Sequence, residues 1–212
     1  AWQRRLGAQA ETCSPADLQR ISGQVQPNGV LALARQPEGR LLPDHGWTLA
    51  LDRIRDPGNM GTLLRTAEWF GASVCCSPDC VDLFNPKVVQ ASMGALFRVP
   101  LETAELADWL GASSRPVFAA ALSGEAAAEV TWPSEGILLI GNEAQGIDPG
   151  LPRTQTLRIG RGRSLQERAD AIQPSGGPGS ADAAESLNAA VAAAILLARQ
   201  LLWACFGILT LI

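Results

Sequence analysis

LALDRIRDPGNMGTLLRTAEWFG, residues 49–71, decides the fold of this chain. The apolar residues at its start predict a short buried strand. Pro57 and Gly58 then break the strand, and Asn59 is a residue type that commonly caps the start of a helix. The apolar spacing that follows predicts one buried helix face, and Gly71 predicts the end of that helix. A strand, tight turn and helix place polar groups at the carboxyl edge of a sheet, where open α/β folds bind ligands.

Two polar side chains of this stretch are candidate functional groups, Asn59 at the predicted start of the helix and Arg65 further along it. A purely structural interpretation is also open. Asn59 is then only a helix cap, and Arg65 only contacts Glu68 or Trp69, three and four residues later on the same helix face. The stretch alone does not decide between these interpretations.

Two later stretches favour the functional interpretation. GILLIGNEAQGI, residues 136–147, is another apolar strand that ends in a polar, glycine-containing turn. SLNAAVAAAILLA, residues 186–198, is a polar triplet that opens a long helix of small residues. In this order the three stretches resemble the signature of the SpoU/TrmH branch of the SPOUT RNA methyltransferases. The matching residues are Asn59 with Arg65, Gly141-Asn142-Glu143, and Ser186-Leu187-Asn188.

The resemblance covers roughly residues 47–200 and includes QASMGALFRVP, residues 90–100. Strands alternating with helices predict an α/β domain with a mostly parallel sheet covered by helices on both faces. The resemblance adds a deep trefoil knot at the C-terminal end, which periodicity does not reveal. We expect a strand followed by a helix within residues 48–70, further strands near 73–76, 97–99, 117–122, 137–140 and 157–159, and helices around 88–93, 105–110 and 187–203.

Residues 1–46 form a separate region in this interpretation. Ser14-Pro15-Ala16-Asp17 predicts the start of a short helix, residues 30–34 are apolar enough for a strand, and residues 37–46 have a linker composition. By resemblance, residues 1–46 are the C-terminal remnant of an N-terminal RNA-binding domain plus a linker. Residues 47–212 are then the SPOUT methyltransferase domain.

The resemblance implies transfer of a methyl group from S-adenosylmethionine to a ribose 2′-hydroxyl of structured RNA, either tRNA or rRNA. Arg65 matches the functional arginine of the family. Because an arginine is a poor base, we expect Arg65 to stabilise the developing alkoxide electrostatically. Asn59 and Glu143 are expected to orient the substrate and the arginine, and Ser186 and Asn188 to complete the catalytic site.

By the same resemblance, Gly141, Ile159 and Leu187 bind the cofactor. A glycine at Gly141 has a physical reason, since a strand end without a Cβ atom can approach a ligand closely. The alternative function is a catalytically inactive RNA-binding or scaffold relative of the same fold, which would be expected to lose the polar site residues. An unrelated nucleotide-binding protein would need a glycine-rich phosphate loop, which the first helix lacks.

Composition limits the partners. The formal charge of −4 argues weakly against nucleic acid, although four arginines cluster in a stretch without acids that is either a phosphate-binding patch or a solvated loop: Arg153, Arg158, Arg161 and Arg163. The chain contains 5 cysteines, and an odd number is typical of a reduced, intracellular protein, so we expect a cytoplasmic location. Cys75, Cys76 and Cys80 lie close in sequence, but they lack a fourth ligand and we predict no metal.

The C-terminal part departs from the family in two ways. An insertion at residues 160–185 is longer than the usual link, and its Pro/Gly/Ser-rich part at 174–180 is expected to be flexible. The chain then ends in the apolar LLWACFGILTLI, residues 201–212. Arg199 makes a membrane span unfavourable, so we expect no membrane partner. The small residues of the last helix instead predict a homodimer formed through the knotted end.

Overall fold

The computed structural model describes the chain except for residues 1–10, 24, 34, 37–41, 161–186 and 210–212. Contacts divide it into two units, Ala1–Pro37 and Glu38–Ile212. In the first unit, helix α2 (Pro15–Ile21) begins where predicted, because the side chain of Ser14 accepts a hydrogen bond from the Asp17 amide. The strand predicted at residues 30–34 is wrong, since the described residues 30–33 are not in a strand.

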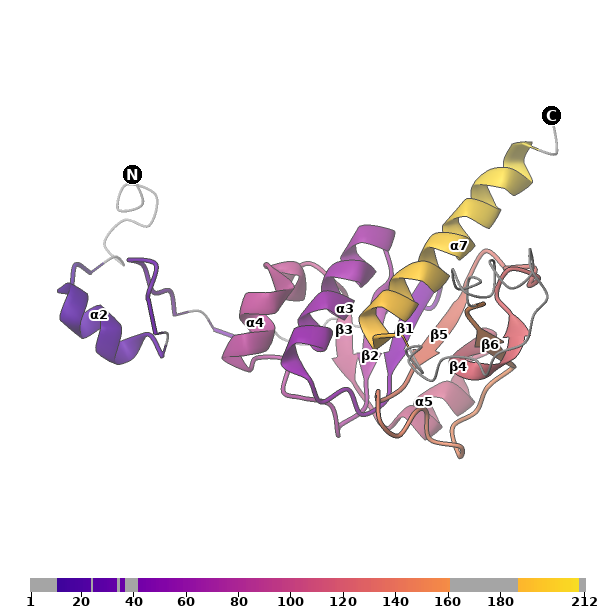
Figure 1. Ribbon diagram of the computed structural model, residues 1–212, viewed down its shortest axis with the longest axis horizontal. Coiled ribbons are helices and arrows are strands. Elements are labelled where there is room, and N and C mark those ends of the chain that lie inside the picture. Colours follow the sequence, from indigo (N-terminus) through magenta and orange to yellow (C-terminus); the bar gives the residue numbers. More distant parts are fainter. Residues whose placement is uncertain (1–10, 24, 34, 37–41, 161–186, 210–212) are drawn as a thin grey trace, which may run out of the picture. The chain divides into compact units, whose positions relative to one another are not determined.

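The second unit is built on a six-stranded sheet in the order β3-β2-β1-β5-β4-β6. Every pairing between these strands is parallel, which confirms the predicted α/β class (Figure 1). The strands are β1 (Trp47–Leu51), β2 (Ser73–Cys76), β3 (Leu101–Thr103), β4 (Val117–Ala126), β5 (Gly136–Ile140) and β6 (Gln155–Arg158). The strand predicted at 97–99 is wrong, because Ala95–Phe97 forms a 3-10 helix and the strand begins at Leu101.

The centre of the sheet brings together segments that are far apart in sequence. Strand β1 pairs with β2 on one side and with β5 on the other. Leu51, the last residue of β1, is opposite both Cys76 of β2 and Ile140 of β5. The three strands therefore end at one edge of the sheet, and the loops that follow them are neighbours. This point, where successive strands depart in opposite directions, is where open α/β sheets bind ligands.

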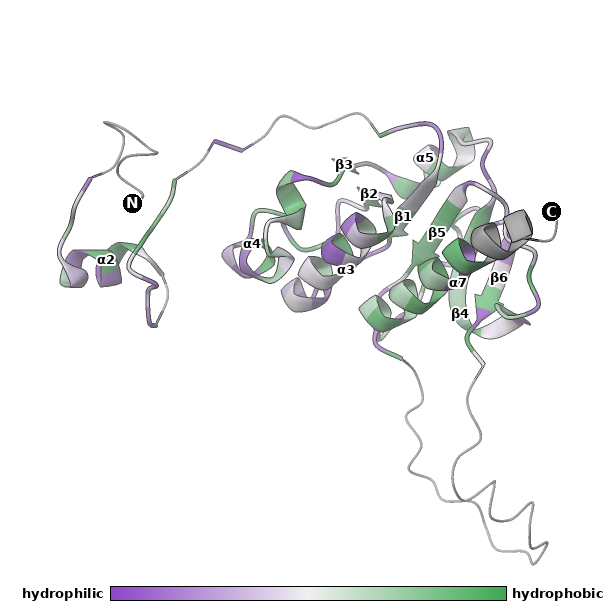
Figure 2. Ribbon diagram, turned by 90° about the horizontal axis from the view of Figure 1, so that it is seen from above, coloured by the Kyte–Doolittle hydropathy of each residue, from purple (hydrophilic) through white to green (hydrophobic). Residues whose placement is uncertain are grey.

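Helices cover both faces of the sheet, as predicted. Helices α3 (Pro57–Phe70), α4 (Pro86–Ser92) and α7 (Ala189–Leu209) lie on one side and α5 (Leu106–Ala112) lies on the other (Figures 1 and 2). Successive strand residues alternate between the two cores. Leu49 and Leu51 pack with α3 and α7, whereas Ala50 packs with the leucines of α5. The central strands are buried on both faces, which explains their continuous apolar runs.

The first helix begins earlier than the sequence suggested. Asp56, not Asn59, is the N-cap of α3, and its carboxylate accepts a 2.7 Å hydrogen bond from the Asn59 amide. Pro57 occupies the first helical position, where its fixed φ and missing N–H are well tolerated. Gly71 ends the helix with φ 67°, as predicted. Because Asp56 provides the cap, the side chain of Asn59 is free for other contacts.

Helix α7 packs its small and apolar residues against α3 and the sheet. Ala190, Ala193 and Leu196 are buried there, while Leu201 and Leu202 are exposed. Within the part of the chain that the structure describes, no helix has the length and apolar character needed to cross a membrane. The knot and the flexibility of the insertion depend on residues 161–186, which lie outside the described residues.

Candidate functional site

A chain of three side chains joins the three sequence motifs at the carboxyl edge of the sheet. The side-chain nitrogen Nδ2 of Asn59, in the first turn of α3, donates a hydrogen bond to the carboxylate of Glu143, which follows β5. The Asn59 side-chain oxygen accepts a 2.7 Å hydrogen bond from the Nδ2 of Asn188, just before α7. Asn59 and Asn188 are separated by 129 positions in the sequence. The fold therefore assembles the predicted residues Asn59, Glu143 and Asn188 into one contiguous polar group.

The chemistry of the three side chains determines which way each amide faces. An ionised Glu143 only accepts hydrogen bonds, so Asn59 must turn its NH₂ group toward it. The oxygen of Asn59 then faces Asn188, which must present its own NH₂ group. The Oδ1 atom of Asn188 is in turn engaged by the amides of Ala190 at 2.9 Å and Val191 at 3.3 Å. Each amide thus has one consistent orientation.

Asn188 has two functions in this arrangement. Its oxygen caps the start of α7, where backbone N–H groups have no partner within the helix. Its nitrogen holds Asn59. The position of the last helix is therefore linked directly to the side chain in the middle of the candidate site.

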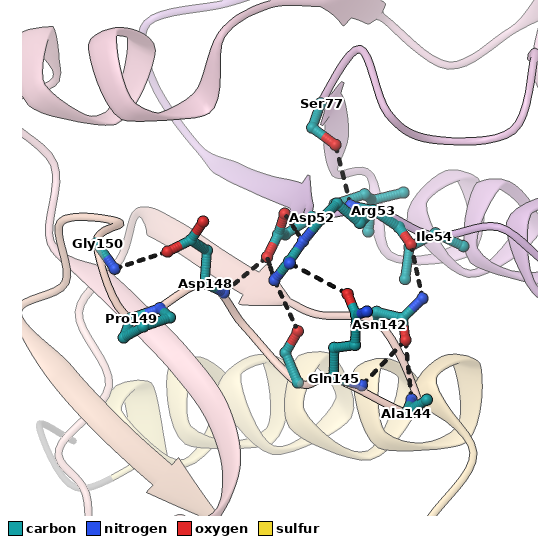
Figure 3. Close-up of polar contacts among 12 residues, drawn as sticks. Asp52, Arg53, Ile54, Ser77, Asn142, Ala144, Gln145, Asp148, Pro149 and Gly150 are labelled. Carbon is teal, nitrogen blue, oxygen red and sulfur yellow. Dashed lines mark hydrogen bonds and ion pairs between the residues drawn. The ribbon is translucent and has the colours of Figure 1, made fainter.

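The loop that carries Glu143 is held by the residue before it. The Asn142 side-chain oxygen accepts from the amides of Ala144 at 2.9 Å and Gln145 at 3.1 Å, which forms a tight turn. Its nitrogen donates to the carbonyl of Arg53 at 2.9 Å, across to the loop between β1 and α3 (Figure 3). Asn142 thereby fixes the two loops that present Glu143 and Asn59.

Asp52 makes a second connection between the loop after β1 and the loop after β5, and the sequence analysis did not predict it. The Asp52 side chain is only 5% exposed, and it makes paired 3.0 Å contacts with the Arg53 guanidinium. It also accepts a 2.8 Å hydrogen bond from the amide of Asp148 (Figure 3). Arg53 has the left-handed backbone conformation, with φ 55°, which is uncommon for a residue other than glycine. The only sequence signal was an acidic residue directly after an apolar strand.

The structure gives a second reason for a glycine at Gly141, in addition to the predicted approach to the cofactor. A Cβ atom on this residue would lie 2.5 Å from the backbone carbon of Gly146 and 2.5 Å from the backbone nitrogen of Ile147. The end of β5 and its own returning loop therefore approach each other closely at Gly141. A glycine here lets that loop fold over the strand end.

The other two predicted cofactor residues lie at the ends of secondary-structure elements. Ile159 is half-buried and directly follows β6, while Leu187 is 49% exposed and precedes α7. Gly141 follows β5, so all three residues are near the carboxyl edge of the sheet. Leu187 is adjacent in sequence to Asn188, which places it beside the polar group. Apolar side chains such as those of Ile159 and Leu187 suit an adenine ring better than a phosphate.

Arg65 does not belong to the polar group within one chain. It lies six residues after Asn59, which corresponds to about 9 Å along the helix and roughly 120° around it. It is exposed, and among the described residues it makes no hydrogen bond or ion pair. Glu68, its expected partner, pairs with Arg98, whose guanidinium holds the Glu68 pKa below its ordinary value. The purely structural pairing of Arg65 with Glu68 is thus wrong.

The remaining candidates divide between described and undescribed parts of the chain. Ser186 lies outside the described residues, as do Arg161 and Arg163. Arg158 donates to the carbonyl of Gly124, and Arg153 donates to carbonyls in its own loop. Among the described residues, no group of three histidine, cysteine or acidic side chains is placed to hold a metal ion.

Comparison with known proteins identifies the family to which this α/β fold and polar group belong. The model of the SpoU rRNA methylase family matches residues 46–159. The chain belongs to this family. The resemblance read from the three motifs is therefore confirmed.

Individual relatives agree with the family. The chain is 33% identical over 175 residues to the 23S rRNA (guanosine(2553)-2′-O)-methyltransferase RlmP of Bacillus subtilis, which covers 80% of this chain and 63% of that protein. A TrmH-family structure from Porphyromonas gingivalis superposes with a TM-score of 0.68 and 37% identity, over 90% of this chain and 73% of that one.

An AdoMet-bound rRNA methyltransferase from Sinorhizobium meliloti superposes with a TM-score of 0.61 and 31% identity, over 76% of this chain and 57% of that one. The chain spans less than two thirds of the length of the first curated relatives it matches, 63% of the Bacillus protein and 23% of a mitochondrial rRNA methyltransferase 3 from Xenopus laevis. The family is thus established over the α/β domain.

Proposed function

We propose that this protein transfers a methyl group from S-adenosylmethionine to a ribose 2′-hydroxyl of RNA. The observation that carries this proposal is the hydrogen-bonded group Glu143–Asn59–Asn188, because it brings the three family motifs together at the ligand-binding edge of the sheet. Relatives named as rRNA 2′-O-methyltransferases support rRNA as the substrate class.

The residues of the site meet the main difficulty of this reaction. A ribose hydroxyl is barely ionised near neutral pH, so its oxygen must be stabilised as it becomes an alkoxide and held in line with the methyl donor. Glu143 and Asn59 provide a hydrogen-bonding surface that orients the hydroxyl. A guanidinium such as Arg65 provides positive charge for the developing oxyanion without taking up its proton.

The residues near the carboxyl edge fit the proposed cofactor. S-adenosylmethionine supplies a methyl group on a positively charged sulfur, and it carries an adenine ring instead of a phosphate chain. Gly141 follows β5, the half-buried Ile159 follows β6, and the exposed Leu187 lies next to Asn188 at the start of α7. We assign these three residues to the cofactor and the polar group to the substrate. The AdoMet-bound relative supports S-adenosylmethionine as the cofactor.

The isolated position of Arg65 supports a shared site in a homodimer. Arg65 is located roughly 120° around α3 from Asn59, and it has no partner among the described residues. In a twofold dimer, Arg65 of one subunit would enter the site of the other. Leu201 and Leu202, exposed near the end of α7, offer apolar surface for the interface.

The path of the chain supports the knot that the family implies. Helix α7 follows β6, which lies at one end of the sheet, yet it packs against α3 and β5 in the middle. The end of β6 and the start of α7 therefore lie at different positions along the sheet. We propose that the knot implied by the family is formed here, and that residues 1–46 contribute to RNA binding. The bacterial rRNA methyltransferase relative supports a cytoplasmic location for this protein.

Transfer of a labelled methyl group to RNA tests the function. The protein and methyl-labelled S-adenosylmethionine would be incubated with total RNA from cells lacking the gene. A product on the 2′-oxygen resists alkaline cleavage at that nucleotide, because alkaline cleavage needs a free 2′-hydroxyl. Label in alkali-resistant dinucleotides supports the proposal. Binding of RNA and cofactor without any transfer would instead identify an inactive relative.

Subunit mixing tests the shared site. Gly141→Val is unsuitable for blocking the cofactor, because the added atoms would strain the β5 loop. We therefore pair an Arg65→Ala subunit with a Glu143→Gln subunit. If the site is shared, each homodimer is inactive, whereas mixed dimers regain part of the activity. An active monomer in sedimentation experiments would contradict the dimer. A mixture that remains as inactive as the two homodimers would contradict the shared site.

A further inference from the structure

Several polar groups surround the sulfur of Cys80, in the loop after β2, among them the carbonyl of Leu51 at 3.3 Å. The Ile54 amide donates to the Cys80 Sγ at 3.3 Å, and the Ser77 hydroxyl lies 3.5 Å from it. Cys76, the last residue of β2, lines the same pocket as Cys80, and its thiol interacts with the Cys80 sulfur. The two side chains are therefore neighbours in one pocket.

These donors stabilise a thiolate at Cys80. The hydrogen bond from Cys76 is the largest cause and lowers the pKa of Cys80 to about 7, while partial burial opposes it. Cys76 has the opposite tendency, because its bond to Cys80 and its burial raise its pKa. Burial raises the pKa of neighbouring Cys75 to about 12. The pair thus consists of one reactive sulfur and one protonated thiol beside it.

The Cys80 sulfur is accessible. Cys76 and Cys80 line a pocket of about 260 Å³ at the carboxyl ends of β2 and β3, with Ser77, Phe84 and Thr103 among its other walls. Cys80 itself is partly exposed, whereas Cys75 is fully buried on the opposite face of the sheet. A small oxidant that enters this pocket meets the Cys80 sulfur.

We propose that Cys76 and Cys80 form a modification site for small peroxides, which convert the two thiols into a reversible disulfide. The Cys80 thiolate attacks one peroxide oxygen, the O–O bond breaks, and the leaving hydroxide takes a proton to give water. The resulting sulfenic acid is attacked by the Cys76 sulfur. The S–S bond forms, the S–O bond breaks, and the Cys76 proton leaves with the hydroxide as a second water.

Oxidation changes the loop that positions Asn59. The reduced Cys80 thiol donates to the Leu51 carbonyl at 3.3 Å and accepts from Ile54. A disulfide sulfur has no proton to donate, and the two sulfur atoms must close to about 2.0 Å. Both changes act on residues 51–54. In this segment, the Arg53 carbonyl accepts a hydrogen bond from the Asn142 side chain. The modification is therefore coupled to both loops of the proposed site.

Mass spectrometry of the full-length protein after hydrogen peroxide treatment tests the chemistry. Trypsin releases Cys75, Cys76 and Cys80 in one peptide, residues 66–87, so substitutions must identify the pair. We expect the wild-type peptide to lose two hydrogens and to regain them with dithiothreitol. Cys75→Ser is the matched control and should behave like the wild type. Cys76→Ser should stop at a sulfenic acid that dimedone traps.

Two results would overturn the proposal. The first is a disulfide in the Cys76→Ser variant, which would make Cys75 the partner. The second is wild-type protein whose residues 66–87 stay unmodified by peroxide at a pH well above the Cys80 pKa. This second measurement needs no variant, so it stands even if a substituted chain fails to fold. Iodoacetamide labelling of Cys80 should also reach half its maximal rate at a pH of about 7.

The effect on function is measured separately from the chemistry. Displacement of reacting groups on the scale of about 1 Å can lower a rate by about a hundredfold, so we expect oxidation to lower methyl transfer by about ten- to a hundredfold, reversibly. Unchanged transfer by the oxidised protein would contradict the coupling to the site. If no transfer is found even in the reduced protein, the proposed function fails, while the mass measurement still decides the disulfide.

Discussion

Asn188 holds the side chain of Asn59 at 2.7 Å while capping the helix that follows it. One amide thereby connects the last helix of the chain to the first helix of the α/β domain. Since Asn59 also contacts Glu143, a change at any of the three positions is expected to affect the other two.

Replacement of Asn59 by aspartate should disrupt this group most strongly. Asn59→Asp removes the donor to Glu143 and places a second carboxylate against it, with about 1 kcal/mol of repulsion even in a water-like environment. We expect methyl transfer to fall by about tenfold or more and the melting temperature to decrease slightly. The measurement is transfer rate together with thermal unfolding.

A double variant provides the control for this prediction. Asn59→Asp combined with Glu143→Gln restores a donor and an acceptor in reversed order, since the glutamine amide can donate to the new carboxylate. The double variant should recover the melting temperature lost by Asn59→Asp alone. Purely additive losses would show that Asn59 and Glu143 do not interact in solution.

Asn188→Asp should separate stability from activity. The new carboxylate still accepts from the amides of α7 and is favoured by the helix dipole, but it cannot donate to Asn59. We expect stability to change by less than about 0.5 kcal/mol while transfer falls. By contrast, Asn188→Ala loses the cap and should cost about 1 kcal/mol. Equal destabilisation by both changes would contradict the assigned cap.

Arg65 should matter for the reaction and not for folding. It is exposed and has no partner among the described residues, so Arg65→Ala should change stability by less than about 0.5 kcal/mol. The same change should abolish methyl transfer and leave cofactor affinity unchanged. Arg65→Lys should also be inactive, because a point charge cannot replace the planar guanidinium. Near-normal turnover of the lysine variant would refute the role.

The Cys80 thiolate predicts a specific dependence of stability on pH. Its pKa is lowered from 9.0 to about 7 in the folded chain, so between these values the unfolded chain binds more protons than the folded one. Stability from this group therefore increases as pH rises from 7 to 9 and is lost as pH falls toward 7. Relative to Cys80→Ser, the wild type should gain about 1–2 kcal/mol across this window. Parallel unfolding curves for the two proteins would contradict the lowered pKa.

Local patterns predicted the elements well because they depend on nearby residues. The apolar run of β1 and the glycine that ends α3 both gave correct elements. Asn59, however, is not the cap it was predicted to be, because Asp56 with Pro57 begins the helix one turn earlier. Strand β3 was misplaced because its pairing with β2 sets its position, and its own short sequence carries little periodicity.

The composition of the site was predicted better than its connections. The three motifs named Asn59, Glu143 and Asn188, but no local pattern indicates that Asn59 lies between the other two. The contact of Asp52 with Asp148, and the approach of Gly141 to its own loop, likewise depend on segments that only the folded sheet brings together. Such contacts between distant segments have no short-range signature in one sequence.

The capping of α7 by Asn188 also fixes when the site first exists during synthesis. All six strands and α3 leave the ribosome before residue 188 does, so the nascent domain has Asn59 and Glu143 but not the third side chain of the group. Until α7 docks, the apolar surface of α3 that it covers also remains open to solvent. The polar group of the proposed site is therefore complete only after α7 has been synthesised and has docked, so a product truncated before residue 188 is expected to lack methyl transfer.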